Sequence, residues 1–420
     1  MKLILITGLF LSLVLVYGEV LGDAPYVALF LSMSIIVVWY LILLSLGRSI
    51  GFRLNFLNKD FSIVDRLLSN ILIWLWLLIV ISWLIGVLIG IINGIDPSFV
   101  FRNFFGLVVY AIFPFMLIIS PSLRSLIIMI FLAGIVQMCY GFERIYFLLT
   151  NPTALHIGLS ISDMRLIYNA GFIVIFPLLM VSMAYQLLPK YYFSNNYGIF
   201  VTRLSKSLIF TLLSVISLLV PAMSKGYILT TAFLIIFIMF ISILYAIEAG
   251  RIHKNIMILL IFLVFTLYML PNSFYELIIN SYSIEEASNS IRFEQFEYLV
   301  SDLTFLGNGL GASLSSGYVR DSSGYGFELT YLNIVHKLGM FSVFLFLSYL
   351  ITLLVAFSRI SKKIYVYESF FVIGLMGYLV VGAGNPLLLS PCAVVLHCIA
   401  MYILVKPFIR PLEEKYQRTR

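Results

Sequence analysis

The sequence has few charged residues, and this shortage limits what the protein can be. Only 11% of its 420 residues are charged and 62% are hydrophobic, whereas soluble domains carry about a quarter charged residues. A chain of this length cannot cover its surface with polar side chains from so small a supply. The composition therefore excludes a soluble cytosolic enzyme, a nucleic-acid-binding protein and a disordered scaffold, and it indicates a membrane protein.

Cysteine and histidine are also scarce. The three cysteines are Cys139, Cys392 and Cys398, and each lies in an apolar stretch. Their spacing fits neither a disulfide framework nor a metal-ligand set, so we expect three small buried hydrophobic side chains. The four histidines form no metal constellation. There is also no P-loop, no Ser-His-Asp arrangement and no carboxylate pair typical of metal-dependent sugar-nucleotide transferases. We expect neither a metal nor a cofactor.

Long apolar stretches dominate what remains. A membrane-spanning helix needs about 20 mostly apolar residues, and the sequence predicts twelve such spans. They are centred near residues 12, 36, 80, 112, 133, 178, 215, 236, 262, 343, 374 and 396. The first could be a signal peptide, but Tyr17-Gly18-Glu19 is not a small-residue cleavage site. We expect an all-α polytopic membrane protein with twelve transmembrane helices.

Basic residues predict the orientation. The chain has 26 Lys and Arg residues and a net charge of +7, and most of these residues fall on the cytoplasmic side if the N-terminus is placed there. An even number of spans then puts both termini in the cytoplasm. The predicted segments are the first nine spans (1–270), a large outer loop (271–328), the last three spans (329–405) and a basic cytoplasmic tail (406–420).

The large outer loop has its own pattern. Within 285–302, four apolar residues recur at helical spacing, namely Phe293, Phe296, Leu299 and Val300. They predict an amphipathic helix on the outer membrane surface. A glycine-rich segment follows from Gly307 to Gly326. Loops of this length are usually functional, although a solvated lid without chemistry remains the plainer alternative.

Charges near a membrane span are costly and therefore become candidates for function. The predicted topology places five of them on the outer face: Arg165, Lys225, Arg292, Arg320 and Glu328. Four of them also have a plain explanation. Arg165 could reach the lipid headgroups, and Arg320 could be neutralised by the neighbouring aspartate. Lys225 could be the tip of a helical hairpin, and Glu328 could favour a helix N-terminus.

Two of these residues suggest chemistry together with their neighbours. Arg292 precedes Gly307-Asn308-Gly309-Leu310-Gly311, and an arginine fork with glycine backbone amides suits a pyrophosphate. We therefore expect Gly309 and Gly311 to contact that group. Glu328 is a candidate general base. His336 and Lys337, on the same predicted helix, favour structural or pore-lining roles.

Three segments resemble the O-antigen polymerase and O-antigen ligase superfamily of bacterial membrane glycosyltransferases. Ser224-Lys225-Gly226 resembles that family's Ser-Arg-Gly turn, and Arg292 to Gly311 resembles its arginine, amphipathic segment and glycine block. Glu328 to Gly339 resembles a segment in which the ligases have His-Asn and, eleven residues after the histidine, a glycine. Glu328 stands in place of that histidine, which favours polymerase over ligase. Arg165 resembles the family's arginine before a middle span.

The resemblance implies a GT-C-like glycosyltransferase in the bacterial inner membrane with a periplasmic active site. It would join undecaprenyl-diphosphate-linked oligosaccharide repeat units during lipopolysaccharide and surface polysaccharide biosynthesis, by metal-independent transfer that inverts the anomeric centre. The diphosphate would be bound by Arg165, Lys225, Arg292, Arg320, Gly309 and Gly311, while Glu328 with Arg292 would act in catalysis. The implied partners are the lipid-linked oligosaccharide, membrane lipids, a chain-length regulator and a flippase, with no nucleic acid.

Other classes stay open at this point. A lipid-linked oligosaccharide flippase or another secondary transporter could also have about twelve spans, but it should place charges at the bilayer midplane. Here the unexplained charges lie at the predicted outer ends. The remaining alternatives are an O-antigen ligase and a noncatalytic assembly partner, which would leave the outer cations unexplained.

Overall fold

The computed structural model describes residues 2–14, 31, 33–35, 37–38, 41, 52–54, 63–150, 170–188, 199–219, 225–248, 287–318, 327–385, 387–388 and 390–411. Its α-helices are α1 (Lys2–Val14), α4 (Ile63–Ile92), α5 (Pro97–Tyr110), α6 (Ile112–Ile119), α7 (Leu123–Thr150), α8 (Ile175–Leu187), α9 (Ile199–Ser205), α10 (Leu208–Leu219), α11 (Lys225–Glu248), α14 (Ala287–Ser301), α15 (Thr330–Leu338), α16 (Ser342–Ser361), α17 (Val366–Leu375), α18 (Tyr378–Val381) and α19 (Pro391–Val405). The 3₁₀ segments are η2 (Ala170–Val174), η5 (Gly339–Phe341), η6 (Gly382–Gly384) and η7 (Lys406–Phe408), and two three-residue strands complete the set, β1 (Phe52–Leu54) and β2 (Ile409–Pro411).

The helical membrane-protein class is confirmed in its coarse form. Five helical stretches are long and apolar enough to cross a membrane: Ile63–Ile92, Leu123–Glu143, Lys225–Glu248, Thr330–Ser361 and Val366–Gly384. Shorter apolar helices cover Lys2–Val14, Gly171–Leu187, Leu208–Leu219 and Cys392–Phe408. The predicted span centres near residues 36 and 262 lie outside the described residues, while the other ten lie in helices. The count of twelve spans remains a prediction.

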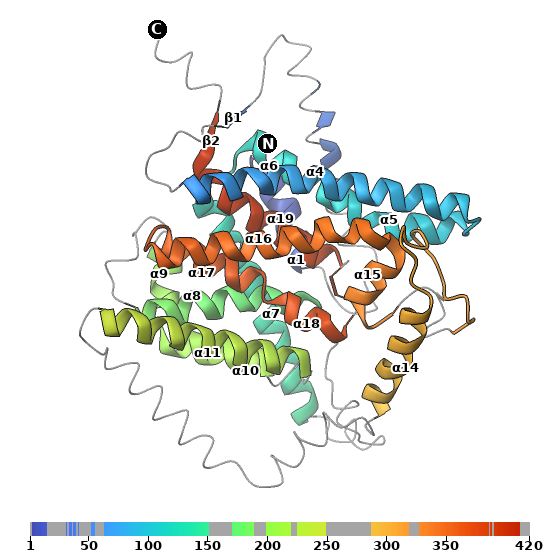
Figure 1. Cartoon of the computed structure of the whole chain (residues 1–420). Coiled ribbons are helices and arrows are strands. Elements are labelled where there is room, and N and C mark those ends of the chain that lie inside the picture. The colour runs from blue at the N-terminus through green and yellow to red at the C-terminus, as the bar shows by residue number, and fades with distance from the viewer. Residues whose placement is uncertain are drawn as a thin grey trace, which may run out of the picture.

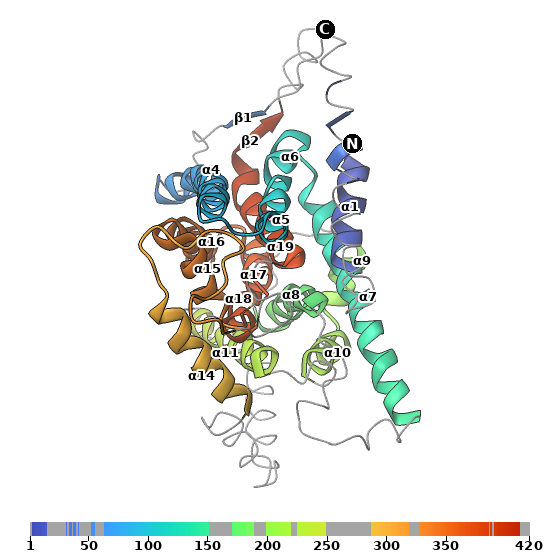
Figure 2. The same ribbon diagram turned by 90° about the vertical axis from the view of Figure 1, so that its right-hand side faces the viewer.

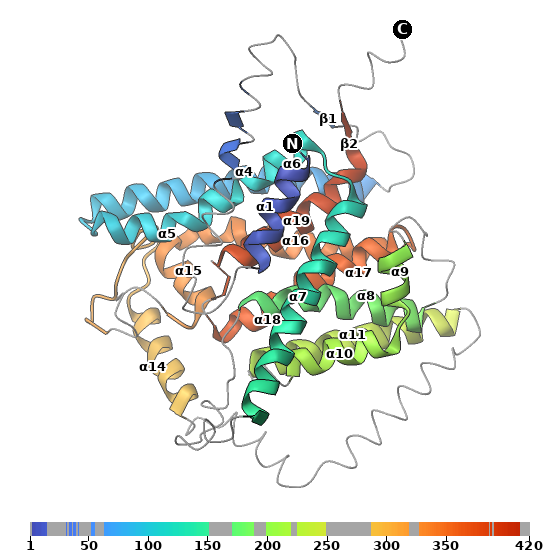
Figure 3. The ribbon, with the colours of Figure 1, turned by 180° about the vertical axis from the view of Figure 1, so that it is seen from behind.

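The long helices form successive layers. Helix α4 packs on α16, α16 on α17, and α17 on α8, which in turn contacts α10 and α11 (Figure 1). Figure 2 looks at the end of the molecule where α14 and α15 lie. On the far side, α1 and α7 pack together and cross the other helices obliquely (Figure 3).

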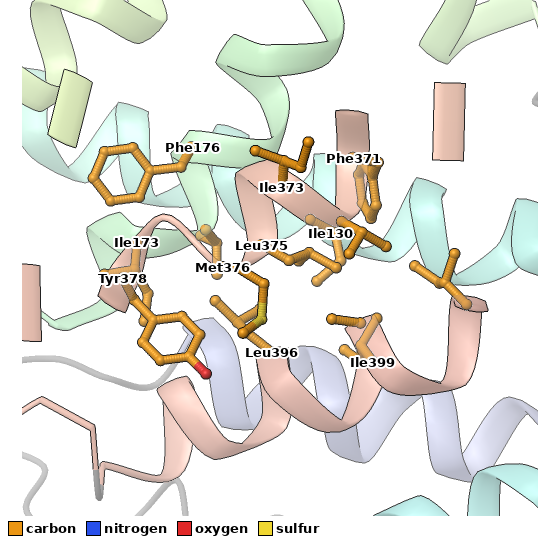
Figure 4. Close-up of a cluster of buried hydrophobic side chains, with 14 of the residues drawn as sticks. Ile130, Ile173, Phe176, Phe371, Ile373, Leu375, Met376, Tyr378, Leu396 and Ile399 are labelled. Atoms are coloured by element: carbon orange, nitrogen blue, oxygen red, sulfur yellow. The ribbon is translucent and has the colours of Figure 1, made fainter. Parts of the chain in front are cut away.

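The centre of these layers is a cluster of buried apolar side chains. In Figure 4, Ile130 of α7, Phe176 of α8, Met376 after α17 and Leu396 of α19 point into one cluster. Helices surrounded by other helices need apolar residues on every face. Accordingly every residue of α17 is buried, and the peripheral helices pack around this cluster.

The peripheral helices nevertheless expose large apolar side chains. Trp74 and Leu88 of α4 and Phe233 and Ile236 of α11 are more than half exposed, as expected for a surface that faces lipid. The same surface corrects one prediction. Cys392 and Cys398 are buried, but Cys139 is exposed on α7, because an apolar residue in a spanning helix can face lipid as readily as the protein interior.

The end of the layers opposite α14 and α15 contains a buried ion pair. Arg359 Nε lies 3.2 Å from Asp65 Oδ1, and both side chains are almost fully buried. Arg359 Nη2 also donates to the carbonyl of Leu404 at 2.6 Å, so the pair joins α4, α16 and α19. Near this end the predicted tail begins inside the fold, since Phe408 is fully buried and β2 pairs antiparallel with β1. That short pair is the only β structure in the described chain and the one departure from an all-α fold.

Candidate functional site

Two charged residues predicted to act together lie in contact. Arg292, on α14, places Nε 3.0 Å from Oε2 of Glu328, which lies two residues before α15. Their side chains are 19% and 21% exposed. The pair is thus neither sealed in the interior nor fully solvated.

A second cation joins this pair through an amide oxygen. Lys225, the first residue of α11, donates from Nζ to Oδ1 of Asn289 at 3.3 Å. Arg292 donates from Nη1 to the same oxygen at 3.4 Å. Lys225, Asn289, Arg292 and Glu328, which we call the charged cluster, therefore come from three separate segments. Because α11 begins at Lys225, its positive dipole end also favours negative charge here.

Glu328 is held by its backbone as well as its side chain. Its amide donates to Oε1 of Gln295 at 3.0 Å, and its carbonyl accepts from the amide of Thr330 at 2.9 Å. Gln295 is fully buried on α14, and its Nε2 has no hydrogen-bond partner among the described residues. The hydroxyl of Thr330 donates to the carbonyl of Asn385 at 2.5 Å. The position of the carboxylate thus follows from how α14 and α15 pack.

Neither Asn289 nor Gln295 was predicted from the sequence. Both lie at a spacing of three residues from Arg292 on the same helix, which places them on one face. That spacing was a usable signal, but neutral amides are common at helix ends and do not stand out without their partners.

Small residues make room for the charged cluster. A Cβ on Gly384 of η6 would lie 3.4 Å from Nε of Arg292, and one on Gly226 would lie 3.2 Å from both Nδ2 of Asn385 and Cα of Val381. These glycines bring the segment after α18 close to α11 and to the guanidinium. A bulky side chain at Gly384 would displace Arg292.

The glycine block packs against α15 and α4. The amides of Asn308 and Gly309 donate to the carbonyls of His336 and Lys337 at 2.8 and 3.0 Å, so they cap the C-terminal end of α15. A Cβ on Gly309 would lie 2.4 Å from the amide nitrogen of Gly90, and one on Gly311 would lie 2.7 Å from that of Val100. The amide of Gly309 is thus already bonded within the protein, and neither glycine leaves room for a side chain, while the contacts of Gly309 and Gly311 with a diphosphate remain predictions.

The predicted structural role of His336 is consistent with its contacts. His336 is fully buried, and its Nε2 lies 2.9 Å from Oδ2 of Asp302 and 2.8 Å from Nδ2 of Asn308. Ser315 also donates to Asp302 through its amide and hydroxyl. Burial by itself would raise the pKa of Asp302, but the hydrogen bonds from Ser315 and His336 outweigh it and hold the pKa below the usual 3.8. Lys337 is buried too and donates to Oδ1 of Asn103 at 2.7 Å.

The helix predicted in the loop between 271 and 328 is present as α14 (Ala287–Ser301), and its placement on the membrane surface remains a prediction. Of the four apolar residues expected on one face, Leu299 is fully buried while Phe293, Phe296 and Val300 are exposed. Leu299 packs with Leu314 and Phe327 in a small separate core. The polar side chains of Arg292 and Gln295 share that inner face because they have partners at the charged cluster.

Two predicted residues, Arg165 and Arg320, lie outside the described residues, and their contacts with a diphosphate remain predictions. Across the described ranges, no three His, Cys, Asp or Glu side chains are grouped as a metal site would require. In comparisons with known proteins no family model matches the chain, and neither curated proteins nor solved structures give a match.

Proposed function

We propose that the protein is a membrane-embedded glycosyltransferase that joins polyprenyl-diphosphate-linked oligosaccharide repeat units, as an O-antigen or surface polysaccharide polymerase does. The observation that carries this proposal is the charged cluster, in which two cations and a carboxylate from three distant segments meet at one end of a strongly apolar helical protein. Ion pairs at protein surfaces are common and weak. Two cations on one oxygen beside a carboxylate are better explained by an anionic substrate.

The cations suit the leaving group of this reaction. When the bond between the anomeric carbon and the diphosphate oxygen breaks, its electron pair stays on that oxygen and negative charge accumulates on the diphosphate. Lys225 and Arg292 would stabilise this charge more in the transition state than in the ground state, which is the condition for catalysis. Arg165 and Arg320 are proposed to add to the same binding.

The carboxylate suits the acceptor. A hydroxyl of the second repeat unit forms the new bond to the anomeric carbon and must lose its proton as it attacks. Glu328, beside Arg292, would accept that proton. Attack from the side opposite the leaving diphosphate inverts the anomeric centre. The energy comes from the cleaved diphosphate linkage, so the reaction does not need a nucleotide.

The proposed setting is the bacterial inner membrane, with both termini in the cytoplasm and the charged cluster at the periplasmic end. The buried Asp65–Arg359 pair would then lie toward the cytoplasm. The lipid-linked oligosaccharide would arrive from a flippase, and a chain-length regulator is the further partner that we propose.

The test is reconstitution of the purified protein in liposomes with a synthetic polyprenyl-diphosphate repeat unit, in EDTA and without nucleotide. We expect longer lipid-linked products from the wild-type protein, and about 10²- to 10⁴-fold slower elongation from Arg292→Ala and Glu328→Gln. The matched controls are Lys362→Ala and Glu297→Gln, two exposed charges away from the cluster, which should elongate normally. Transfer of the unit across the bilayer without elongation would instead support a flippase, and full activity in both site variants would refute the assignment.

A further inference from the structure

Asn289 occupies an unusual position between the two cations. Its Oδ1 accepts from Nζ of Lys225 at 3.3 Å and from Nη1 of Arg292 at 3.4 Å. Both distances are longer than those typical of charge-assisted hydrogen bonds, which are about 2.7–2.9 Å. Two positive groups thus converge on one neutral oxygen that binds each of them weakly.

The position between Lys225 and Arg292 favours an anionic oxygen. Two cations held near one another repel, and the repulsion is relieved best by negative charge between them. An amide oxygen carries only a partial charge, so a phosphate oxygen at the same point would bind both donors more strongly. The N-terminal end of α11, which begins at Lys225, adds to the preference for an anion.

Arg292 can make this exchange without losing Glu328. Its Nε lies beside Oε2 of Glu328, while a different nitrogen, Nη1, faces Asn289. An anion that replaces the Asn289 oxygen would therefore leave the pair between Arg292 and Glu328 in place. The carboxylate would stay next to the bound anion, where the proposed reaction requires it.

We propose that Asn289 is a positioning residue whose side-chain oxygen aligns Lys225 and Arg292, and that a phosphate oxygen of the donor takes over its place between them. This inference rests on the proposed function and adds a residue that sets the preference for a diphosphate. Asn289 itself takes no part in bond formation. Its loss should therefore weaken donor binding and leave the chemical step unchanged.

The most direct test changes the charge at the side-chain oxygen of Asn289 and leaves the shape of the side chain almost the same. Asn289→Asp has the same shape but places a full negative charge between the cations, where it competes with a phosphate oxygen. Ser290→Asp is the matched control, because Ser290 is the next residue on α14 and is exposed. Binding of geranyl diphosphate, a sugar-free probe, is measured by calorimetry on the full-length protein in nanodiscs.

We expect Asn289→Asp to weaken probe binding about tenfold or more and Ser290→Asp to change it less than about twofold, since a charge acts strongly only where it is not screened by solvent. Asn289→Ala should raise the KM for the lipid-linked donor several-fold with kcat nearly unchanged, as expected when only binding is affected. Melting temperatures of all variants establish that they are folded.

Two outcomes overturn the inference, and they can be told apart. If the wild-type protein binds the probe and Asn289→Asp binds it equally well, Asn289 does not mark the anion position, while the proposed function stands. If the wild-type protein does not bind the probe, the diphosphate site itself is wrong and both proposals fall. A loss of kcat at unchanged KM in Asn289→Ala would also contradict a positioning role.

Discussion

The side-chain oxygen of Gln295 accepts the backbone amide of Glu328 at 3.0 Å, and this bond ties the carboxylate to the helix that carries Arg292. Arg292 and Glu328 lie on either side of the glycine-rich segment in the sequence. Gln295 nevertheless connects them, because it is on the same helix as Arg292 and binds the backbone of Glu328. Because Gln295 is fully buried between these segments, the geometry between Arg292 and Glu328 depends on the packing of α14 against α15.

Exchanging the charges of Arg292 and Glu328 distinguishes a role of the pair in stability from a role in catalysis. Arg292→Glu and Glu328→Arg each place like charges together, whereas the double exchange restores an ion pair of opposite polarity. We expect each single change to lower stability by at most about 1 kcal/mol, because the pair is partly exposed, and the double exchange to recover it. Elongation should stay abolished in all three, since the positive group would no longer face the donor. Recovered elongation in the double exchange would mean that the pair is only a structural contact.

Charge at the start of α11 is expected to matter more than shape. Lys225→Arg keeps the cation and should elongate within a few-fold of wild type, while Lys225→Glu should lose about 10²-fold or more, the typical effect of removing a transition-state donor. Rates of polymer formation at saturating donor give the comparison. Equal losses in both variants would point to a steric requirement at this position.

Glycine 309 is expected to control stability instead of ligand binding. Its φ is +93° and an added Cβ would lie 2.4 Å from the Gly90 amide nitrogen, so Gly309→Ala should destabilise by about 2 kcal/mol or more. Gly317→Ala is the control, because Gly317 also has a positive φ of +74° but nothing within 4 Å of the added Cβ. Gly317→Ala should lower the free energy of unfolding by about 1–2 kcal/mol, from backbone strain alone.

Detergent melting curves distinguish the two glycine variants, and geranyl diphosphate titration is then done on the folded fraction. Normal probe affinity in folded Gly309→Ala supports a packing role. If Gly309→Ala has wild-type stability but does not bind the probe, Gly309 belongs to the ligand site.

Asp302 should make the segment between α14 and α15 sensitive to acid. The hydrogen bonds from Ser315 and His336 hold the pKa of Asp302 below 3.8 despite the opposing effect of burial, so its folded pKa lies below its unfolded value. Its contribution to stability is then complete above about pH 4 and is lost as the pH falls through the folded pKa. Asp302→Asn removes that contribution.

The difference in unfolding free energy between wild type and Asp302→Asn is the quantity to follow, in detergent from pH 7 down to pH 3. It should be constant near neutrality and shrink at the acidic end. A difference that grows as the pH is lowered would mean that the sign of the pKa shift is wrong.

Composition and hydropathy settled the class of this protein without coordinates. With 62% hydrophobic residues and 11% charged ones, a helical membrane protein follows from solvation alone, because backbone groups in lipid must be bonded within helices. The scarcity of charge also made Arg292, Glu328 and Lys225 stand out as candidates. Charged residues are rare in lipid-exposed segments because each is costly there unless it is paired, so their positions stood out without tertiary information.

The tertiary structure decided which of those residues meet and what the others do. The inner face of α14, the use of the Gly309 amide to cap α15, and the place of Asn289 between two cations all depend on contacts between segments that are distant in the chain. Hydrogen-bond capacity is the same for a glycine amide at a ligand site and at a helix end. Only the packing of α14, α15 and α4 determines which acceptor it finds, and no local pattern in the sequence encodes that choice.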